Sequence, residues 1–260
     1  MIEDLTPLII TLDEAPNIRR TIEKLLWAKR IVAVDSGSTD GTLDILRSYP
    51  QIAVIHRDFD SFASQCNFGL SQVHTPWVLS LDADYELSDA LVTEIASLRP
   101  READSGFRAS FVYRIFGRPL RGSLYPPRVV LYRRDQATYV DEGHGHRVTL
   151  PGGIGELAGA IYHDDRKPLS RWLDAQRKYA TGEADYLLSQ DDATLRGFDR
   201  VRRTAWLAPF VALFYTLIVK RCILDGWPGW YYALQRVLAE ILIAIEIVDR
   251  RLRGRSDRGG

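Results

Sequence analysis

The stretch Trp77-Val-Leu-Ser-Leu-Asp-Ala-Asp-Tyr-Glu-Leu87 joins an apolar run to closely spaced acids. Its first five residues predict a buried strand, and Asp82, Asp84 and Glu86 follow. Because side chains alternate along an extended chain, Asp82 and Asp84 are expected on one face. Two carboxylates at the end of a buried strand can share a divalent cation whose other positions go to phosphate oxygens. The short motif by itself also allows an acidic loop without a ligand.

Composition limits the class of protein. The chain has 260 residues, of which 46% are hydrophobic, and this suits one sizeable α/β domain with an appendage. Lys and Arg total 34, as do Asp and Glu, so the net charge is zero and no basic field indicates a nucleic-acid partner. Only Cys66 and Cys222 are present, which argues against a disulfide or zinc scaffold.

Short apolar runs alternate with helical patterns in the first half of the chain. The runs predict strands at residues 8–12, 31–35, 52–56 and 77–81, and the patterns between them predict helices near residues 18–27, 43–49 and 61–73. Such an alternation indicates βαβ units and a mostly parallel sheet. Further strands are expected at 107–115 and 129–132, and the chain is mainly helical from residue 169.

Polar residues gather where these strands end. Open parallel sheets bind ligands beyond the carboxyl ends of their strands. The residues concerned are Thr11 and Glu14 after the first strand, Asp35 and Ser36 after the second, and Asp82 and Asp84 after the fourth. Their convergence predicts a binding site at one sheet edge, and polar loops that only cap the strands are the alternative.

The chain resembles family 2 glycosyltransferases, on the strength of Asp35-Ser-Gly-Ser-Thr-Asp-Gly-Thr42 together with Asp82-Ala-Asp84. Residues 57–67 and His163-Asp-Asp-Arg-Lys167 are similar to stretches of bacterial lipopolysaccharide-core-type members. The resemblance implies an α/β fold of GT-A type, with a Rossmann-like, mostly parallel catalytic domain at residues 1–165. Residues 166–260 then form a helical membrane-associating region with an apolar hairpin and a basic tail.

The resemblance also implies a nucleotide-diphosphate-sugar donor and a Mg²⁺ or Mn²⁺ ion, a Lewis acid that stabilises the charge of the leaving diphosphate. It assigns the metal to Asp84, with His163 as a second metal or diphosphate contact or, alternatively, a structural hydrogen-bonder. It assigns the nucleotide sugar to Thr11, Glu14, Asp35, Ser36, Gln65, Asn67 and Asp82. Gln65 and Asn67 lie two positions apart, so a helix brings only one of them to the donor.

Inverting transfer, which the family implies, needs a base within hydrogen-bond reach of the acceptor hydroxyl. The catalytic candidates are Asp141, Glu142 and His144. Many relatives have His-Glu here, whereas this chain has Asp141-Glu-Gly-His-Gly-His146. We favour Asp141 or Glu142 as the base and His144 as a phosphate or metal contact, and charged loop residues without a catalytic part remain the alternative.

Two apolar segments near the end of the chain bear on location. Residues 204–219 carry no charge, yet at ~1.5 Å per residue they fall short of the ~30 Å hydrocarbon core. Residues 233–248 include three charged side chains, and the last residues are rich in Arg. This pattern predicts a peripheral or monotopic membrane anchor. The resemblance to lipopolysaccharide-core-type enzymes implies that the anchor lies on the cytoplasmic face of the inner membrane and that the acceptor is lipid-linked or a glycolipid. A packed helical subdomain or a homo-oligomer interface is the alternative.

Other functions fit less well. A sugar nucleotidyltransferase needs a Gly-rich loop after the first strand, and a dinucleotide oxidoreductase needs Gly-x-Gly-x-x-Gly there. The segment Leu12-Asp-Glu-Ala-Pro-Asn17 has no glycine. A catalytically retired, membrane-bound binding protein would not need the intact Asp82 and Asp84 pair.

Overall fold

The computed structural model describes residues 1–122, 124–142, 145–191, 193–195 and 197–256. The chain divides into two compact units. The sheet unit comprises Met1–Gly117 and Leu124–Arg166, and the helical unit comprises Arg118–Ser123 and Lys167–Gly260. The short segment Arg118–Ser123 therefore groups with helices that follow it much later in the sequence.

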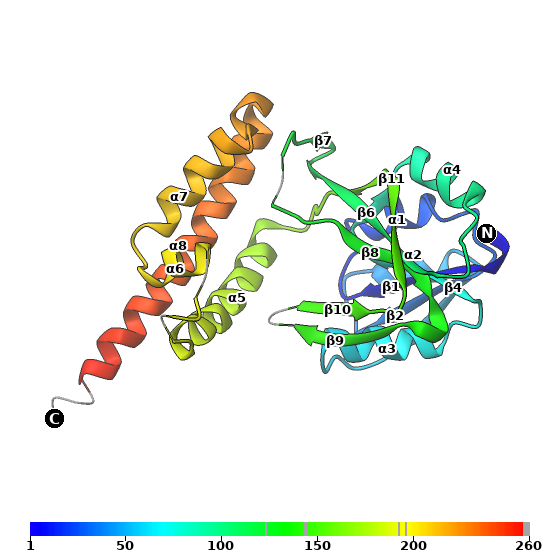
Figure 1. The fold of residues 1–260 in the computed structure, drawn as a ribbon, viewed down its shortest axis with the longest axis horizontal. Helices are drawn as coiled ribbons and strands as arrows, with labels where there is room; N and C mark the ends of the chain where they lie inside the picture. The colour runs from blue at the N-terminus through cyan, green and yellow to red at the C-terminus, as the bar shows by residue number, and fades with distance from the viewer. Residues whose placement is uncertain (123, 143–144, 192, 196, 257–260) are drawn as a thin grey trace. The chain divides into compact units, whose positions relative to one another are not determined.

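The sheet unit alternates strands and helices through its first half (Figure 1). Its strands are β1 (Leu5–Thr11), β2 (Ile31–Asp35), β3 (Ile52–His56), β4 (Trp77–Asp82), β5 (Tyr85–Leu87), β6 (Asp104–Ile115), β8 (Arg128–Arg133), β9 (Thr138–Glu142), β10 (Gly145–Thr149) and β11 (Gly153–His163). Its helices are α1 (Ile18–Glu23), α2 (Thr42–Arg47), α3 (Phe62–Ser71) and α4 (Asp89–Ser97), with short 3-10 turns at Ile2–Asp4 and Arg134–Gln136.

The main sheet is mixed, with the strand order β3-β2-β1-β4-β8-β6-β11-β5. The pairs among β3, β2, β1 and β4 are parallel, as is β6 with β11. Strand β8 runs antiparallel to both β4 and β6, and β5 runs antiparallel to β11. The expectation of a mostly parallel sheet therefore holds for the first four strands. It fails later because β6 returns to β8 through a loop, and only a helical crossover would keep the two parallel.

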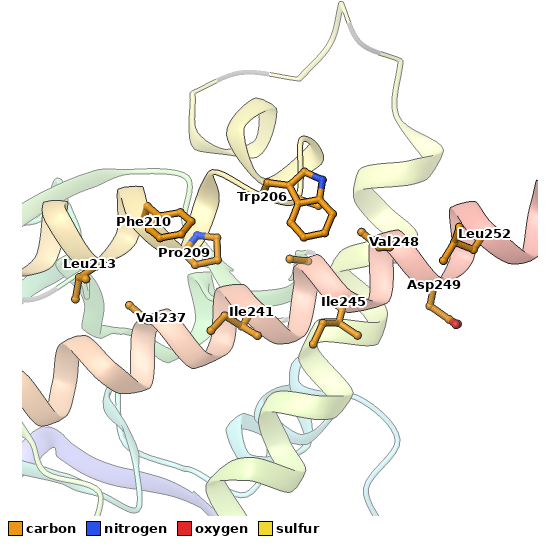
Figure 2. Close-up of a pocket in the computed structure, with 12 residues that line it drawn as sticks. Trp206, Pro209, Phe210, Leu213, Val237, Ile241, Ile245, Val248, Asp249 and Leu252 are labelled. Carbon is orange, nitrogen blue, oxygen red and sulfur yellow. The ribbon is translucent and has the colours of Figure 1, made fainter.

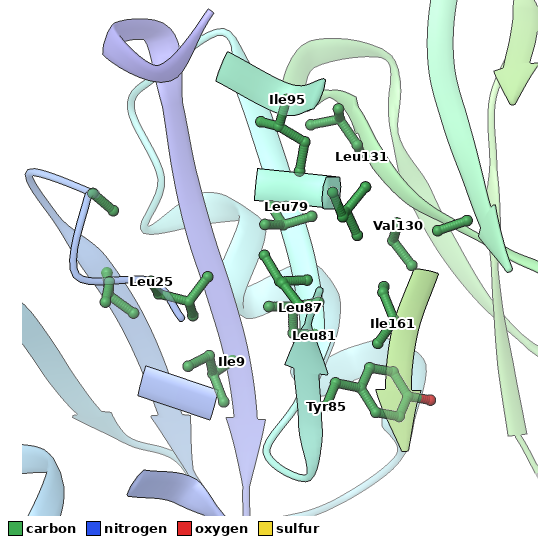
Figure 3. Packing of buried hydrophobic residues seen from close by; sticks show 14 of the residues in the cluster. Ile9, Leu25, Leu79, Leu81, Tyr85, Leu87, Ile95, Val130, Leu131 and Ile161 are labelled. Atoms are coloured by element: carbon green, nitrogen blue, oxygen red, sulfur yellow. The ribbon is translucent and has the colours of Figure 1, made fainter. Parts of the chain in front are cut away.

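Strands β1, β2 and β4 are largely buried on both faces, whereas the edge strand β3 is only partly buried. On β1, Leu5 and Ile9 belong to one hydrophobic cluster with residues of α1, α2 and α4, and Leu8 belongs to another with residues of α3. Figure 3 shows the first cluster, with Ile9 and Leu25 near Leu81 and Leu87. Strands buried on both faces are continuous apolar runs in sequence, which is why the residues of β2 could be predicted with the bounds observed.

The helical unit holds α5 (Leu169–Ser189), α6 (Phe198–Arg203), α7 (Ala208–Phe214), a π-helical turn η3 (Tyr215–Val219), a 3-10 turn η4 (Cys222–Asp225) and α8 (Trp227–Ser256), with the two-residue strand β7 (Arg118–Pro119). Helices α5 and α8 pack through a small apolar cluster that includes Ala184 and Ile243. Arg202 joins α6 to α8 through Glu240 at 2.7 Å. None of the helices in the described part of the chain is both long and apolar enough to cross a membrane.

Candidate functional site

The sheet brings the ends of β1, β2 and β4 together. Strand β1 lies between the other two, with Thr11 opposite Asp35 and Ile10 opposite Asp82. Parallel pairing fixes this neighbourhood, because strands that run the same way end at the same edge. The polar residues that follow three separate strands in the sequence are thus close in space.

Asp35 holds the loop that follows β2. One of its carboxylate oxygens accepts hydrogen bonds from the backbone amides of Gly37 at 2.8 Å and Ser38 at 2.9 Å, and the other accepts from the Ser38 hydroxyl. Gly37 has φ +100°, a conformation that favours glycine. The predicted ribose or base contact Asp35 is therefore a buried residue that also shapes the loop at the sheet edge.

Glu14 lies in a network that the sequence did not reveal. Its Oε2 accepts a hydrogen bond from Nδ2 of Asn17 at 2.8 Å, and the same nitrogen donates to Oδ1 of Asp165 at 2.9 Å. Asn17 Oδ1 accepts from the backbone amide of Arg166 at 2.9 Å. Asn17 thereby ties the end of β1 to the segment that follows β11, 148 residues further along the chain.

Two buried oxygens at this edge have no hydrogen-bond partner among the described residues, namely Thr11 Oγ1 and Gln65 Oε1. Gln65 donates through Nε2 to Ser36 Oγ at 3.0 Å and to the backbone oxygen of Arg57 at 2.9 Å. A buried polar atom without a partner costs about 1–3 kcal/mol. The edge therefore suits a polar ligand that supplies the missing donors.

Asn67 faces a different neighbour. Its amide exchanges two hydrogen bonds with the backbone of Tyr139, donating to the carbonyl at 3.0 Å and accepting from the N–H at 2.9 Å. This pairing attaches α3 to β9. Of the two predicted donor contacts on α3, Gln65 is the one that reaches Ser36 at the sheet edge.

Asp84 and His163 meet across the sheet. Strand β4 ends at Asp82, a turn carries Asp84, and β5 then pairs antiparallel with β11 so that Tyr85 lies opposite His163. His163 Nε2 lies 3.1 Å from Asp84 Oδ2, with side-chain exposures of 14% and 11%. Burial alone lowers the pKa of His163, but the charge and hydrogen bond of Asp84 outweigh it, so the pKa is raised.

Aromatic rings surround His163. The ring centroids of Tyr113, Tyr125 and Tyr85 lie 4.7, 5.0 and 5.4 Å from the imidazole, and the hydroxyls of Tyr85 and Tyr125 contact one another. Burial raises the pKa of both phenols, and the charge of Asp82 raises it further. Both phenols therefore stay protonated, and because one hydroxyl donates to the other, one phenol proton is left for a further hydrogen bond.

The sequence analysis missed these tyrosines as site residues. Tyr113 is placed opposite His163 by the pairing of β6 with β11. A strand was expected at residues 107–115, but the sequence did not show which strand would pair with it. Tyr125 comes from the loop before β8. No spacing in the sequence links either one to His163.

The residues present fit a divalent cation that is shared with a substrate. The described residues contain no group of three or more His, Cys, Asp and Glu side chains that could hold a metal ion. Asp84 and His163 supply one carboxylate and one imidazole within 3.1 Å of each other. A cation such as Mg²⁺ or Mn²⁺ commonly takes one or two protein ligands and completes its shell with phosphate oxygens and water.

Two of the three base candidates, Asp141 and Glu142, lie at the end of β9, which pairs with β10. Asp141 Oδ1 accepts a hydrogen bond at 3.1 Å from the backbone N–H of Ala63, in the first turn of α3. Glu142 is the last residue of β9, paired with Gly145, and only its backbone is described. His144 lies outside the described residues.

Comparisons with known proteins agree with this arrangement. The family model described as Glycosyl transferase family 2 matches residues 8–141. The lipopolysaccharide core biosynthesis glycosyltransferase LpsC of Rhizobium meliloti (strain 1021) is 28% identical over 95% of this chain and 92% of its own length. A glycosyltransferase of Rickettsia typhi (strain ATCC VR-144 / Wilmington) is 33% identical over 97% of this chain and 89% of its own length.

Solved structures that are similar to this chain include two in complex with a nucleotide sugar. The mannosyltransferase PcManGT from Pyrobaculum calidifontis, in complex with GDP-Man and Mn²⁺, has a TM-score of 0.49 at 14% identity, covering 94% of this chain and 87% of its own. S. aureus TarS 1-349 with UDP-GlcNAc has a TM-score of 0.46 at 15% identity, covering 95% and 91%. Since the family model spans more than half of the chain, the protein belongs to glycosyl transferase family 2 and is a glycosyltransferase.

Proposed function

We propose that this glycosyltransferase moves a sugar, with inversion, from a nucleotide-diphosphate sugar to a lipid-linked or glycolipid glycan, assisted by Mg²⁺ or Mn²⁺. The observation that carries the proposal is the Asp84 and His163 pair at 3.1 Å. The pair stands beside the edge where β1, β2 and β4 end, and ligands of open α/β sheets bind at such edges.

The metal, when bound, supplies Lewis-acid stabilisation of the negative charge that develops on the leaving diphosphate. Asp84 and His163 would hold it. The charge of Asp82 acts on the hydroxyls of Tyr85 and Tyr125, so we assign Asp82 to the ribose side of the donor. Both phenols keep their protons, and the proton that is not shared between their two hydroxyls is suited to a hydrogen bond with an oxygen of the nucleotide sugar.

The nucleotide is assigned to the edge formed by β1 and β2. Thr11 Oγ1 and Gln65 Oε1 are buried oxygens that need donors, and base N–H groups and ribose hydroxyls are donors of that kind. Glu14 and Asp35 lie on the same edge and complete the proposed contacts. Ser36 is held by Gln65 at 3.0 Å and stands at the start of the loop that would approach the phosphates.

We assign the catalytic base to Glu142. An inverting transfer requires a group that removes the proton from the acceptor hydroxyl as that oxygen attacks the anomeric carbon. Asp141 is engaged with the N–H of Ala63 at 3.1 Å, which gives it a role in holding α3. His144 remains a proposed phosphate or metal contact.

The acceptor is proposed from the relatives and from the helical unit. The relative LpsC is named for lipopolysaccharide core biosynthesis, and a glycan of that type is carried by a lipid. The helical unit exposes many large apolar side chains, among them Trp206, Phe210 and Trp227. We therefore propose that the enzyme works at the cytoplasmic face of the inner membrane, peripherally or as a monotopic protein.

A donor screen tests this function. Purified enzyme is incubated with individual nucleotide sugars and Mn²⁺ or Mg²⁺, and release of nucleoside diphosphate is measured with and without a metal chelator. We expect one donor class to be turned over only with metal, and Asp84→Asn to lower the rate about 100-fold, because a metal contributes several kcal/mol to such a transition state. Asp89→Asn is the matched control, since the Asp89 side chain is exposed and forms an ion pair with Lys24 at 2.7 Å. Turnover that is unaffected by both the chelator and Asp84→Asn would contradict the proposal.

A further inference from the structure

The helical unit contains an open apolar groove of about 570 Å³ between α7 and α8 (Figure 2). A groove of this volume is within the range that binds small molecules. The lining is hydrocarbon and aromatic except for one carboxylate at an end, and it consists of Ala205, Trp206, Pro209, Phe210, Leu213, Val237, Ile241, Ala244, Ile245, Val248, Asp249 and Leu252.

Helix α8 is apolar on two faces. Ile243 and Ile247 are buried in the cluster shared with α5. Ile241, Ile245 and Leu252 lie on the other face, line the groove and are exposed. One apolar stripe is enough for a surface helix, and a helix that is apolar all round is normally covered on every side. The second stripe therefore needs a covering partner.

One residue of the groove lining has an unusual backbone conformation. Ala205 has φ +69°, a left-handed conformation that costs an alanine free energy and persists only where the surroundings impose it. The strained residue comes directly before Trp206, which is 73% exposed, as is Phe210. Tryptophan is enriched where an apolar phase meets water, because its ring is apolar and its N–H is polar.

The net charge of the helical unit distinguishes between two possible partners of the groove, a second copy of the chain and a lipid surface. The helical unit has 18 Lys and Arg against 11 Asp and Glu, whereas the sheet unit has 16 against 23. Each unit thus carries a net charge of seven, positive for the helical unit and negative for the sheet unit. A second copy packed face to face through the groove would oppose two positive units, whereas an anionic lipid surface complements the charge.

Two arginines stand next to Leu252, the last residue of the lining, and Arg251 Nη2 donates a hydrogen bond to the backbone oxygen of Arg203 at 2.6 Å. Arg251 and Arg253 flank Leu252 at the end of the groove, and both are exposed. Arg253 forms an ion pair with Asp249 at 2.7 Å, so the single acid of the lining is already matched. From Val237 to Leu252 the helix rises ~22 Å, which exceeds the ~15 Å that one leaflet contributes to a ~30 Å hydrocarbon core.

From these observations we infer that the groove binds one acyl chain of an anionic membrane phospholipid, with the headgroup phosphate toward Arg251 and Arg253. This deepens the membrane location given in the proposed function and rests on it in part, but it requires no transferase activity. The enzyme then holds a lipid chain between α7 and α8, which is a more specific contact than partitioning of its apolar side chains into the surface.

A soluble probe tests the groove by itself. Full-length enzyme is titrated with dansylaminoundecanoic acid below its micelle concentration, and the dansyl fluorescence is followed. We expect saturable binding that Ala244→Phe weakens about tenfold or more, because the new ring fills the groove while keeping it apolar. Ile245→Gln is expected to weaken binding as well, and Leu234→Gln is the matched control, since Leu234 is 58% exposed on the same helix and Ile245 60%. Absence of saturable binding, or equal binding by Ala244→Phe, would overturn the inference.

Vesicles test the lipid. Sedimentation with phosphatidylcholine vesicles, with and without phosphatidylglycerol, is compared for the wild type, Phe210→Gln in the groove and Phe214→Gln outside it on the same helix. We expect binding that requires phosphatidylglycerol and that falls more for Phe210→Gln than for Phe214→Gln.

Sedimentation velocity without lipid should show a monomer. A dimer that Ala244→Phe dissociates would overturn the inference in favour of a second copy. Asp84→Asn should still bind vesicles, so failure of the catalytic proposal and failure of this one are distinguishable.

Discussion

At the scale of single residues, the proposed metal site depends on one contact, in which Asp84 Oδ2 lies 3.1 Å from His163 Nε2. Asp84 and His163 were each marked by their own motif, but they are 79 positions apart. Their contact depends on the pairing of β5 with β11, and β5 is too short to be distinguished from the acidic turn before it. The tyrosines around His163 had no signal at all, since aromatic residues near strands are usually core.

Asp141 and Glu142 give the first residue-scale prediction. Asp141→Asn keeps an oxygen for the N–H of Ala63, so its stability and turnover number should stay near those of the wild type. Asp141→Ala removes the contact and should lower the free energy of unfolding by about 1 kcal/mol, as measured by urea denaturation. Glu142→Gln should retain stability and lose turnover about 100-fold or more.

The same variants can also contradict the assignment of Glu142 as the base. A large loss of turnover in Asp141→Asn, with stability unchanged, would transfer the role of base to Asp141. Retained turnover in Glu142→Gln would exclude Glu142. Donor affinity, measured separately by nucleotide binding, should be the same in all three variants because none of the changes touches the proposed donor contacts.

At the scale of elements, the parallel strands were predictable and the later strands less so. Strand β2 was found with its observed bounds because burial on both faces leaves an uninterrupted apolar run. Strand β3 is only half-buried, but its first four residues are also apolar, so its bounds could be found as well. The hairpin of β9 and β10 was missed because its residues are largely polar or glycine, and such a composition is typical of loops. The tail was expected to be helical, with two apolar segments at residues 204–219 and 233–248, but nothing in the sequence indicated the π-helical turn between α7 and α8.

Gly159 on β11 provides an element-scale prediction. A Cβ at this position would lie 2.4 Å from Leu91 Cα and 2.6 Å from Leu91 N, and the backbone of α4 cannot yield as a flexible side chain can. The Gly159 N–H also donates to Glu94 Oε2 at 2.8 Å. Gly159→Ala should therefore lower the free energy of unfolding by about 1–3 kcal/mol or more, as measured by urea denaturation.

Gly254 near the end of α8 is the control for that experiment. A Cβ there meets no atom within 4 Å, and alanine is favoured over glycine in a helix by up to about 1 kcal/mol. Gly254→Ala should be neutral or slightly stabilising. Equal stability of the Gly159→Ala and wild-type proteins would show that α4 does not pack on β11 as closely as described.

At the scale of the whole molecule, the net charge of zero hides an unequal distribution of charge between the two units. The chain total of zero divides into seven negative charges on the sheet unit and seven positive charges on the helical unit. Composition alone could not show this, because the division needs the boundary between the units and the assignment of residues 118–123. The separation sets how the protein should respond to salt.

Vesicle binding should therefore depend on ionic strength while groove binding should not. Raising salt from about 0.1 to 1 M shortens the Debye length from about 10 to about 3 Å, so sedimentation with phosphatidylglycerol vesicles should fall severalfold. Binding of dansylaminoundecanoic acid rests mainly on apolar contact and should change little. Salt-independent vesicle binding would mean that the positive charge of the helical unit does not contribute.

The central claim is that Asp84 and His163 hold a divalent cation against the donor diphosphate. The most direct test is an electron paramagnetic resonance titration of Mn²⁺, in which the signal of free Mn²⁺ is followed with the enzyme in the presence of UDP or GDP. We predict that one nucleotide strengthens Mn²⁺ binding to the wild type and to Asp89→Asn, and that Asp84→Asn and His163→Ala each weaken it about tenfold or more. Identical Mn²⁺ binding by all four proteins would contradict the account.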